Sequence, residues 1–141
     1  MSIKAGKHIT LETLLARKQQ SENDKMKVFL FNSEVLGGNI EIVKQKARDI
    51  MKIMDSTDER GMEASNEMNC KIILKHCPVF KEKELQTAYG VAEPHELVTK
   101  VFDENLGEIG KLAEKILGIY GLADEKKKTN LIEEEVEEIK N

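Results

Sequence analysis

The middle of the chain carries three side chains of the kinds that bind zinc. Cys70, His76 and Cys77 supply two thiols and one imidazole. A structural zinc site takes four ligands, usually in closely spaced pairs, and the sequence contains neither a CxxC pair nor an HxxxH pair. His8 and His95 would complete a site only through tertiary coincidence. A metal-binding module or enzyme that uses Cys70, His76 and Cys77 is one alternative, and we favour small buried side chains near a helix end.

The two cysteines are not expected to form a disulfide with each other. On one helix Cys70 and Cys77 would be separated by a rise of about 10.5 Å, which is too far for an S–S bond. We expect both thiols to be reduced and buried.

Other catalytic patterns are missing from the sequence. Neither a GxSxG turn nor a Walker-type phosphate loop occurs. Carboxylates are plentiful at 133–138, but a solvated acidic run lacks the burial that shifts a carboxyl pKa toward catalysis. We therefore predict no enzyme activity, no catalytic residue, no cofactor and no metal.

Length and charge narrow the class of protein further. The 141 residues suffice for one domain with its own core. The 22 basic and 26 acidic residues are interleaved and give a net charge of -4, which argues against nucleic-acid binding. No apolar run reaches the roughly 20 residues that span a bilayer, and the first ten residues do not form a secretory signal. We expect no membrane association and a location in the cytoplasm.

The elements that position these residues begin with an N-terminal helix. Residues 1–9 lack periodicity and are predicted to form a flexible arm. Thr10 is a plausible N-cap for a helix to about Asn23, with Leu11, Leu14 and Leu15 on one side. This half-apolar helix would dock on its own domain or on a partner.

A β-hairpin is predicted near 25–44. Two short β-branched and aromatic runs flank a loop that contains Gly37 and Gly38, and Ile40 and Ile42 share one face. A lone hairpin is marginally stable, so a helix or a second copy must cover its apolar face.

The rest of the chain shows helical spacing. A helix over 44–55 would bury the side that carries Ala47, Ile50, Met51 and Met54. Ser56 and Glu59 fit a capping box for the next helix, which would bury Met62 and other apolar residues and end at Cys77 and Pro78. Short helices should follow over 81–89, from Pro94 and from Leu106. Gly121 is predicted to give the last helix a Schellman ending with Leu122 folded back.

These patterns predict an α+β fold that is mostly α. Five or six short helices would pack with one small hairpin in a single domain over 1–122. Residues 123–141 would form a charged linker and an acidic, weakly amphipathic tail, either disordered or a docking helix.

Several segments together resemble a known family. The runs "LETLLARKQQSENDKMKV", "KHCPVFKEKELQTAYGVAEPHELVTKVF", "GEIGKLAEKILGIYGL" and "VEEIKN" are similar, in this order, to the XkdN-like tail assembly chaperones of phages and defective prophages of Gram-positive bacteria. The resemblance implies a non-enzymatic protein that keeps a tape measure protein soluble while tail tube subunits polymerise around it. It also implies action in the host cytoplasm and absence from the mature virion. A permanent structural component of a tail or baseplate is the other interpretation.

The resemblance supplies no contact residues, so surface chemistry must suggest them. Apolar stripes on the two chain ends have the least obvious internal partners. The predicted partner-binding residues are the tail set, Leu131, Ile132, Val136 and Ile139, and then Leu11, Leu14 and Leu15. The expected partners are the tape measure protein and the tail tube subunit, and a homo-oligomer is also considered.

Overall fold

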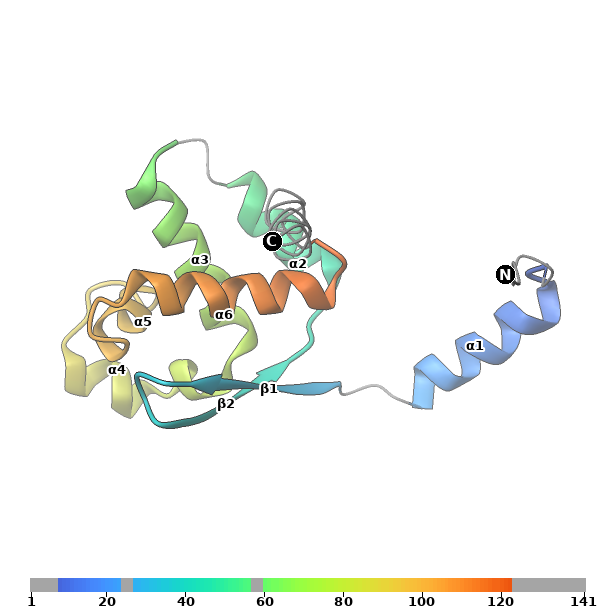
Figure 1. The fold of residues 1–141 in the computed structure, drawn as a ribbon, viewed down its shortest axis with the longest axis horizontal. Coiled ribbons are helices and arrows are strands. Elements are labelled where there is room, and N and C mark those ends of the chain that lie inside the picture. The colour runs from blue at the N-terminus through green and yellow to red at the C-terminus, as the bar shows by residue number, and fades with distance from the viewer. Residues whose placement is uncertain (1–7, 24–26, 57–59, 123–141) are drawn as a thin grey trace, which may run out of the picture.

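The computed structural model describes residues 8–23, 27–56 and 60–122. Over these ranges the chain forms six α-helices, one 3-10 helix and one two-stranded antiparallel sheet, which confirms the mostly helical α+β fold. In chain order (Figure 1) the elements are α1 (Leu11–Asn23), β1 (Val28–Ser33), β2 (Gly38–Val43), α2 (Ala47–Asp55), α3 (Met62–His76), η2 (Pro78–Lys81), α4 (Lys83–Tyr89), α5 (Glu96–Val101) and α6 (Leu106–Ile119).

The first helix begins where its cap residue predicts. The Thr10 hydroxyl accepts a hydrogen bond from the Thr13 backbone N–H at 3.2 Å, as a helix N-cap does. Figure 1 shows α1 set apart from the remaining helices, beyond the outer end of β1. Residues 1–7 of the predicted arm lie outside the described residues.

The hairpin is confirmed, and its two faces differ. Phe29 pairs with Ile42 and Phe31 with Ile40, so these side chains share the face that packs into the core. The neighbours of this face are α6 and η2, which supply the cover that a two-stranded sheet needs. Lys115 of α6 donates to the Leu30 carbonyl, so part of the outer edge of β1 is already paired.

One carboxylate connects the hairpin loop to α6. Glu108, in the first turn of α6, accepts from the buried Ser33 hydroxyl and from the Val35 backbone N–H, the latter at 3.2 Å. The Asn105 side chain caps the same turn by accepting from the Glu108 N–H at 3.1 Å. A helix N-terminus favours negative charge, so the Glu108 carboxylate both stabilises the start of α6 and holds the hairpin loop.

The core lies between α3, α5, α6 and the hairpin. The most extensive helix packing joins α3 to α6. Two aromatic rings from different elements, Phe80 and Phe102, lie with their centroids 6.0 Å apart. The fully buried apolar side chains are Ile42, Ile72, Ile73, Cys77, Leu97, Val98, Phe102, Ile109, Leu112 and Ile116.

Both predicted endings of the long helices are confirmed. Residue Cys77 is extended, and α3 stops at His76 just before Pro78. At the other end, Gly121 has a φ of 74°, a left-handed conformation that glycine adopts without strain. The Leu122 N–H donates to the Leu117 carbonyl at 2.9 Å, which completes the backbone pattern of the Schellman motif. The Leu122 side chain is 44% exposed, so its predicted folding back onto the helix is not seen.

Three helix details differ from the sequence prediction. Ser56 does not cap α3, because it continues the last turn of α2 and its hydroxyl donates to the Ile53 carbonyl at 2.7 Å. The helix α3 starts later, at Met62, and that side chain is exposed. In α2, Ile50 and Ile53 face the core, whereas Ala47, Met51 and Met54 of the predicted buried side are exposed.

Two short helices also start later than predicted. Glu82 is extended and separates η2 from α4, so the predicted helix over 81–89 is shortened. Pro94 lies in the turn before α5, which begins at Glu96. The helix predicted from Pro94 is nevertheless present in shorter form, and its Leu97 and Val98 side chains lie in the core.

Candidate functional site

The fold does not arrange the zinc-type residues as a metal site. In His76, Nδ1 lies 2.8 Å from the Ile72 carbonyl oxygen, and a carbonyl only accepts, so this nitrogen carries the hydrogen. The other ring nitrogen, Nε2, lies 2.9 Å from the Tyr120 hydroxyl. Both nitrogens are therefore used in hydrogen bonds within the protein.

The hydroxyl of Tyr120 is at the centre of a partly buried hydrogen-bond network that includes His76. It accepts from the Gln45 N–H at 2.7 Å and donates its one hydrogen to the Gln45 carbonyl at 2.8 Å, while Nε2 of His76, at 2.9 Å, is a second acceptor within reach of that hydrogen. Lys44 contacts the ring of Tyr120 with its Nζ 5.4 Å from the centroid. The network thus joins the ends of α3 and α6 to the segment that precedes α2.

Burial shifts the titration of the groups in this region. Desolvation lowers the pKa of His76 below 6.5, because the imidazolium would lose its hydration. The same effect raises the pKa of the Tyr120 phenol. It raises the pKa of Cys77 to about 12 and also raises that of Cys70, whose Sγ lies 3.3 Å from the Thr99 hydroxyl.

Both cysteines are free and buried, as expected from their spacing. Among residues 8–23, 27–56 and 60–122, the structure contains no group of three His, Cys, Asp or Glu side chains placed to hold a metal ion. Protonated thiols and an internally bonded imidazole are poor ligands. This arrangement argues against the metal-site alternative.

Exposed apolar side chains on α1 form one candidate surface for binding a partner. On α1, Leu11, Leu14 and Leu15 are 72%, 54% and 56% exposed. They recur at three- and four-residue steps and so share one side of the helix. The structure thus leaves the predicted first-helix set accessible, and none of its leucines belongs to the core.

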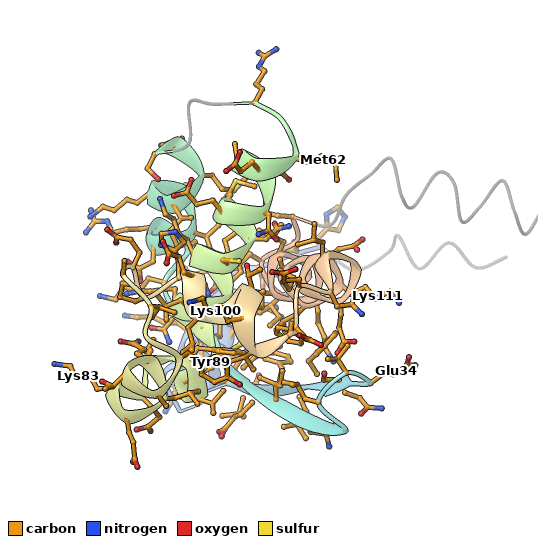
Figure 2. All side chains as sticks on the ribbon, turned by 90° about the vertical axis from the view of Figure 1, so that its left-hand side faces the viewer. Glu34, Met62, Lys83, Tyr89, Lys100 and Lys111 are labelled. Atoms are coloured by element: carbon orange, nitrogen blue, oxygen red, sulfur yellow. The ribbon has the colours of Figure 1, made fainter. Side chains whose placement is uncertain are left out.

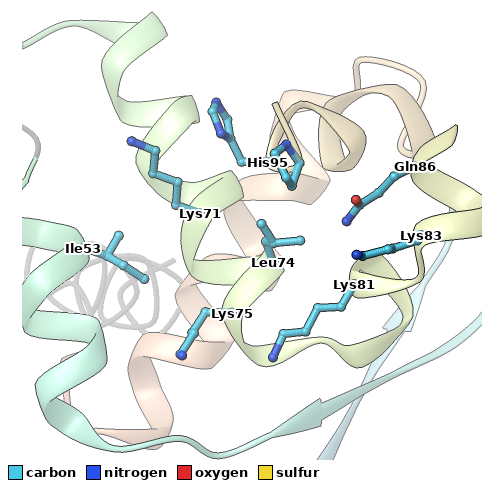
Figure 3. A pocket seen from close by; sticks show the side chains of 9 residues that line it. Ile53, Lys71, Leu74, Lys75, Lys81, Lys83, Gln86 and His95 are labelled. Carbon is cyan, nitrogen blue, oxygen red and sulfur yellow. The ribbon is translucent and has the colours of Figure 1, made fainter. Parts of the chain in front are cut away.

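A second surface is a groove of about 460 Å³ between α2, α3, η2 and α4. Its apolar lining comes from Ile53, Leu74 and Pro94. Four basic side chains surround this apolar strip, namely Lys71, Lys75, Lys81 and Lys83. Figure 3 shows Leu74 on α3 between Ile53 of α2 on one side and Lys81 and Lys83 on the other. We call this surface the lysine groove.

The lysines of the groove are only partly neutralised. Lys71 lies 3.6 Å from Glu67 and Lys75 lies 3.9 Å from Asp49, both in partly exposed pairs that contribute little stability. Within the described residues, neither Lys81 nor Lys83 has an ion-pair partner. The groove is therefore basic, although the whole chain has a net charge of -4.

The lysine groove was not found from the sequence. Lys71 and Lys75 are one helical turn apart and share a side of α3 with Leu74, which is the only local signal. Lys81 and Lys83 come from the next two elements and reach the groove through tertiary packing. The predicted tail set, Leu131, Ile132, Val136 and Ile139, lies outside the described residues, so its binding role stays a prediction.

No helix in the described part of the chain is both long and apolar enough to cross a membrane. Comparison with known proteins adds one finding. A family model described as "Phage XkdN-like tail assembly chaperone protein" matches residues 11–140. No curated protein and no solved structure matches the chain.

Proposed function

The chain belongs to the family of XkdN-like phage tail assembly chaperones, and from this premise we propose that it binds the tape measure protein during tail tube assembly. Binding would keep the tape measure protein soluble until tail tube subunits cover it. The observation that carries this proposal is the exposed leucine side of α1, which is available to a partner.

A tape measure protein needs such a partner because its exposed apolar surface promotes aggregation. A tape measure protein is a long, largely helical chain whose apolar stripes would aggregate before the tube covers them. Helices with exposed leucines at Leu11, Leu14 and Leu15 pack against apolar helical stripes through complementary side chains. The tail set at 131–139 is proposed as a second contact of the same kind.

The strength of binding must allow release. Burying one leucine side chain contributes about 1.5–3 kcal/mol, and the three on α1 are already partly covered. Association also costs translational and rotational freedom. Contact through α1 is therefore weak enough for tube subunits to displace the chaperone, which is consistent with reversible action.

Reversible action distinguishes the chaperone from a permanent component. We propose that the protein acts in the bacterial host cytoplasm, binds its partner non-covalently without enzymatic chemistry, and leaves before the virion is complete. A structural component of the tail or baseplate would remain in purified particles. Mass spectrometry of purified particles separates the two, because stoichiometric amounts of this chain in them would overturn the chaperone proposal.

The binding surface is tested by co-purification of the tape measure protein with variants of this chain. Leu14→Glu places a charge on the exposed side of α1 without disturbing the core. Met62→Glu is the matched control, because Met62 is 80% exposed on another helix. We expect Leu14→Glu to reduce recovery of the tape measure protein at least tenfold, equivalent to about 1.4 kcal/mol.

The outcomes of that experiment distinguish the surface from the function. Equal recovery with both variants would remove α1 from the binding surface. A chain truncated after Leu122 then tests the tail set, which the truncation removes. If the wild-type chain itself recovers no tape measure protein, the proposed function is wrong.

A further inference from the structure

The lysine groove combines an apolar strip with positive charge that is only partly neutralised. Leu74 and Ile53 provide an apolar floor, and the ammonium groups around it favour an acidic partner. Figure 3 shows these side chains gathered around one opening. The matching ligand is an acidic amphipathic segment with apolar residues on one side.

The chain itself contains one such segment. Residues 131–139 read "LIEEEVEEI", with five glutamates among four apolar residues. At helical spacing, Ile132, Val136 and Ile139 fall on one side, and the glutamates flank that side. We propose that this C-terminal segment binds the lysine groove of its own chain.

The end of α6 lies close enough for this to happen within one molecule. Tyr120, two residues before Leu122, is hydrogen-bonded to His76 at 2.9 Å. Lys75 of the groove is the residue before His76 in α3. Residues 123–130 connect Leu122 to Leu131 and, fully extended, can span about 28 Å.

A second copy of the chain is a weaker occupant of the groove. A segment joined by a short connection has an effective concentration on the order of millimolar. At micromolar protein concentrations, binding within one chain therefore outcompetes binding between chains. The glutamate–lysine attraction also predicts weakening by salt, because about 1 M salt shortens the Debye length to about 3 Å.

This interaction gives the tail a state in which its apolar side is covered. In the free protein the segment would occupy the groove, and a partner that binds the tail would have to release it. This interaction involves the chain alone, so it can be measured without the tape measure protein and independently of the proposed function.

The experiment uses the full-length chain with a nitroxide spin label near its C-terminus. Asn141→Cys supplies the attachment site, and the native Cys70 and Cys77 are buried with raised pKa values, so they do not compete for the label. The backbone amide signals of Leu74 and Lys75 report proximity of the label to the groove. We expect them to lose most of their intensity relative to the sample with reduced label.

Two charge-reversal variants provide the specificity test. Lys81→Glu alters the groove, whereas Lys111→Glu makes the same change on α6. Figure 2 shows Lys83 of the groove and Lys111 at opposite sides of the molecule. We expect Lys81→Glu or 1 M salt to restore the amide intensities of Leu74 and Lys75, and Lys111→Glu to leave them suppressed.

Three results would overturn the inference. The first is full intensity of the groove amides in the labelled wild-type chain. The second is equal restoration by Lys81→Glu and Lys111→Glu, which would indicate net charge and no specific groove. The third is signal loss in a mixture of isotope-labelled chains without nitroxide and unlabelled chains with nitroxide, which would indicate binding between copies.

Discussion

The hydroxyl of Tyr120 lies 2.9 Å from Nε2 of His76, so the C-terminal end of α6 is hydrogen-bonded to the last residue of α3. Through the same oxygen, Tyr120 also bonds both backbone groups of Gln45. Three segments that are distant in sequence meet at this point. This contact is next to the lysine groove in the sequence, because Lys75 of the groove precedes His76 in α3.

Removal of this hydroxyl should destabilise the fold. Tyr120→Phe keeps the ring but leaves the partly buried Gln45 N–H and the buried His76 nitrogen without their partner, which costs about 1–3 kcal/mol of unfolding free energy. Urea denaturation measures the change. Tyr89→Phe is the control, because Tyr89 is exposed, and it should shift stability by no more than about 0.5 kcal/mol. Equal effects of the two substitutions would contradict the structural role of Tyr120.

Stability should fall in mildly acidic solution because of His76. Desolvation places the pKa of His76 in the folded chain below its ordinary value of 6.5, and it outweighs the opposing effect of the hydrogen bond to the Ile72 carbonyl. Lys81 and Lys75 also lower this pKa, and Asp49 raises it. Below pH 6.5 the unfolded chain therefore binds a proton that the folded chain does not. The contribution of His76 to the unfolding free energy is full above pH 6.5 and decreases as the pH falls toward the lower, folded-state pKa.

The titration itself can be followed by NMR. The imidazole signals of His76 in the native chain should titrate with a midpoint below 6.5. Urea denaturation between neutral and mildly acidic pH should show the matching decrease in stability. A midpoint above 6.5 would reverse the predicted sign and would mean that the folded state favours the imidazolium.

Both cysteines should be unreactive in the native protein. Reaction with a thiol reagent requires an exposed thiolate, whereas burial raises the pKa of Cys77 to about 12 and that of Cys70 above its ordinary value. At pH 8 we expect almost no modification of the native chain and rapid modification of both thiols in denaturant. Fast labelling of the native chain would show that these side chains are accessible.

Glu108 should stabilise the hairpin through its loop. Glu108→Ala removes the acceptor for the Ser33 hydroxyl and the Val35 N–H, at a cost of about 1.5–3 kcal/mol for bonds to a charged group. Glu63→Ala makes the same change in the first turn of α3, where it loses only the smaller helix-dipole contribution. Thermal or urea unfolding compares the two. A loss no larger for Glu108→Ala would contradict the anchoring role.

The sequence predicted features whose causes lie within one turn of chain. The Thr10 cap, the end of α3 before Pro78 and the Gly121 ending are local, because the groups that bond are at most five residues apart. The core of α6 was also predictable, since Ile109, Leu112 and Ile116 follow one helical stripe.

Features set by tertiary packing were not predictable in this way. Helix α2 has apolar residues on two sides, so its sequence does not show which side faces the core. In the structure Ile50 is buried and Met51 is exposed. The Ser56 prediction failed because Ser56 bonds back to α2. The hydrogen bond from Ser33 to Glu108 and the lysine groove join residues from separate elements, which a single sequence does not pair.

The most direct test of the proposed function is the solubility of the tape measure protein expressed with and without this chain. The proposal predicts that the tape measure protein is largely insoluble alone and moves to the soluble fraction with the wild-type chain, in a complex of defined stoichiometry. It also predicts that Met62→Glu retains this effect and that Leu14→Glu loses most of it. A tape measure protein that stays insoluble beside an abundant, folded wild-type chain would contradict the chaperone function proposed here.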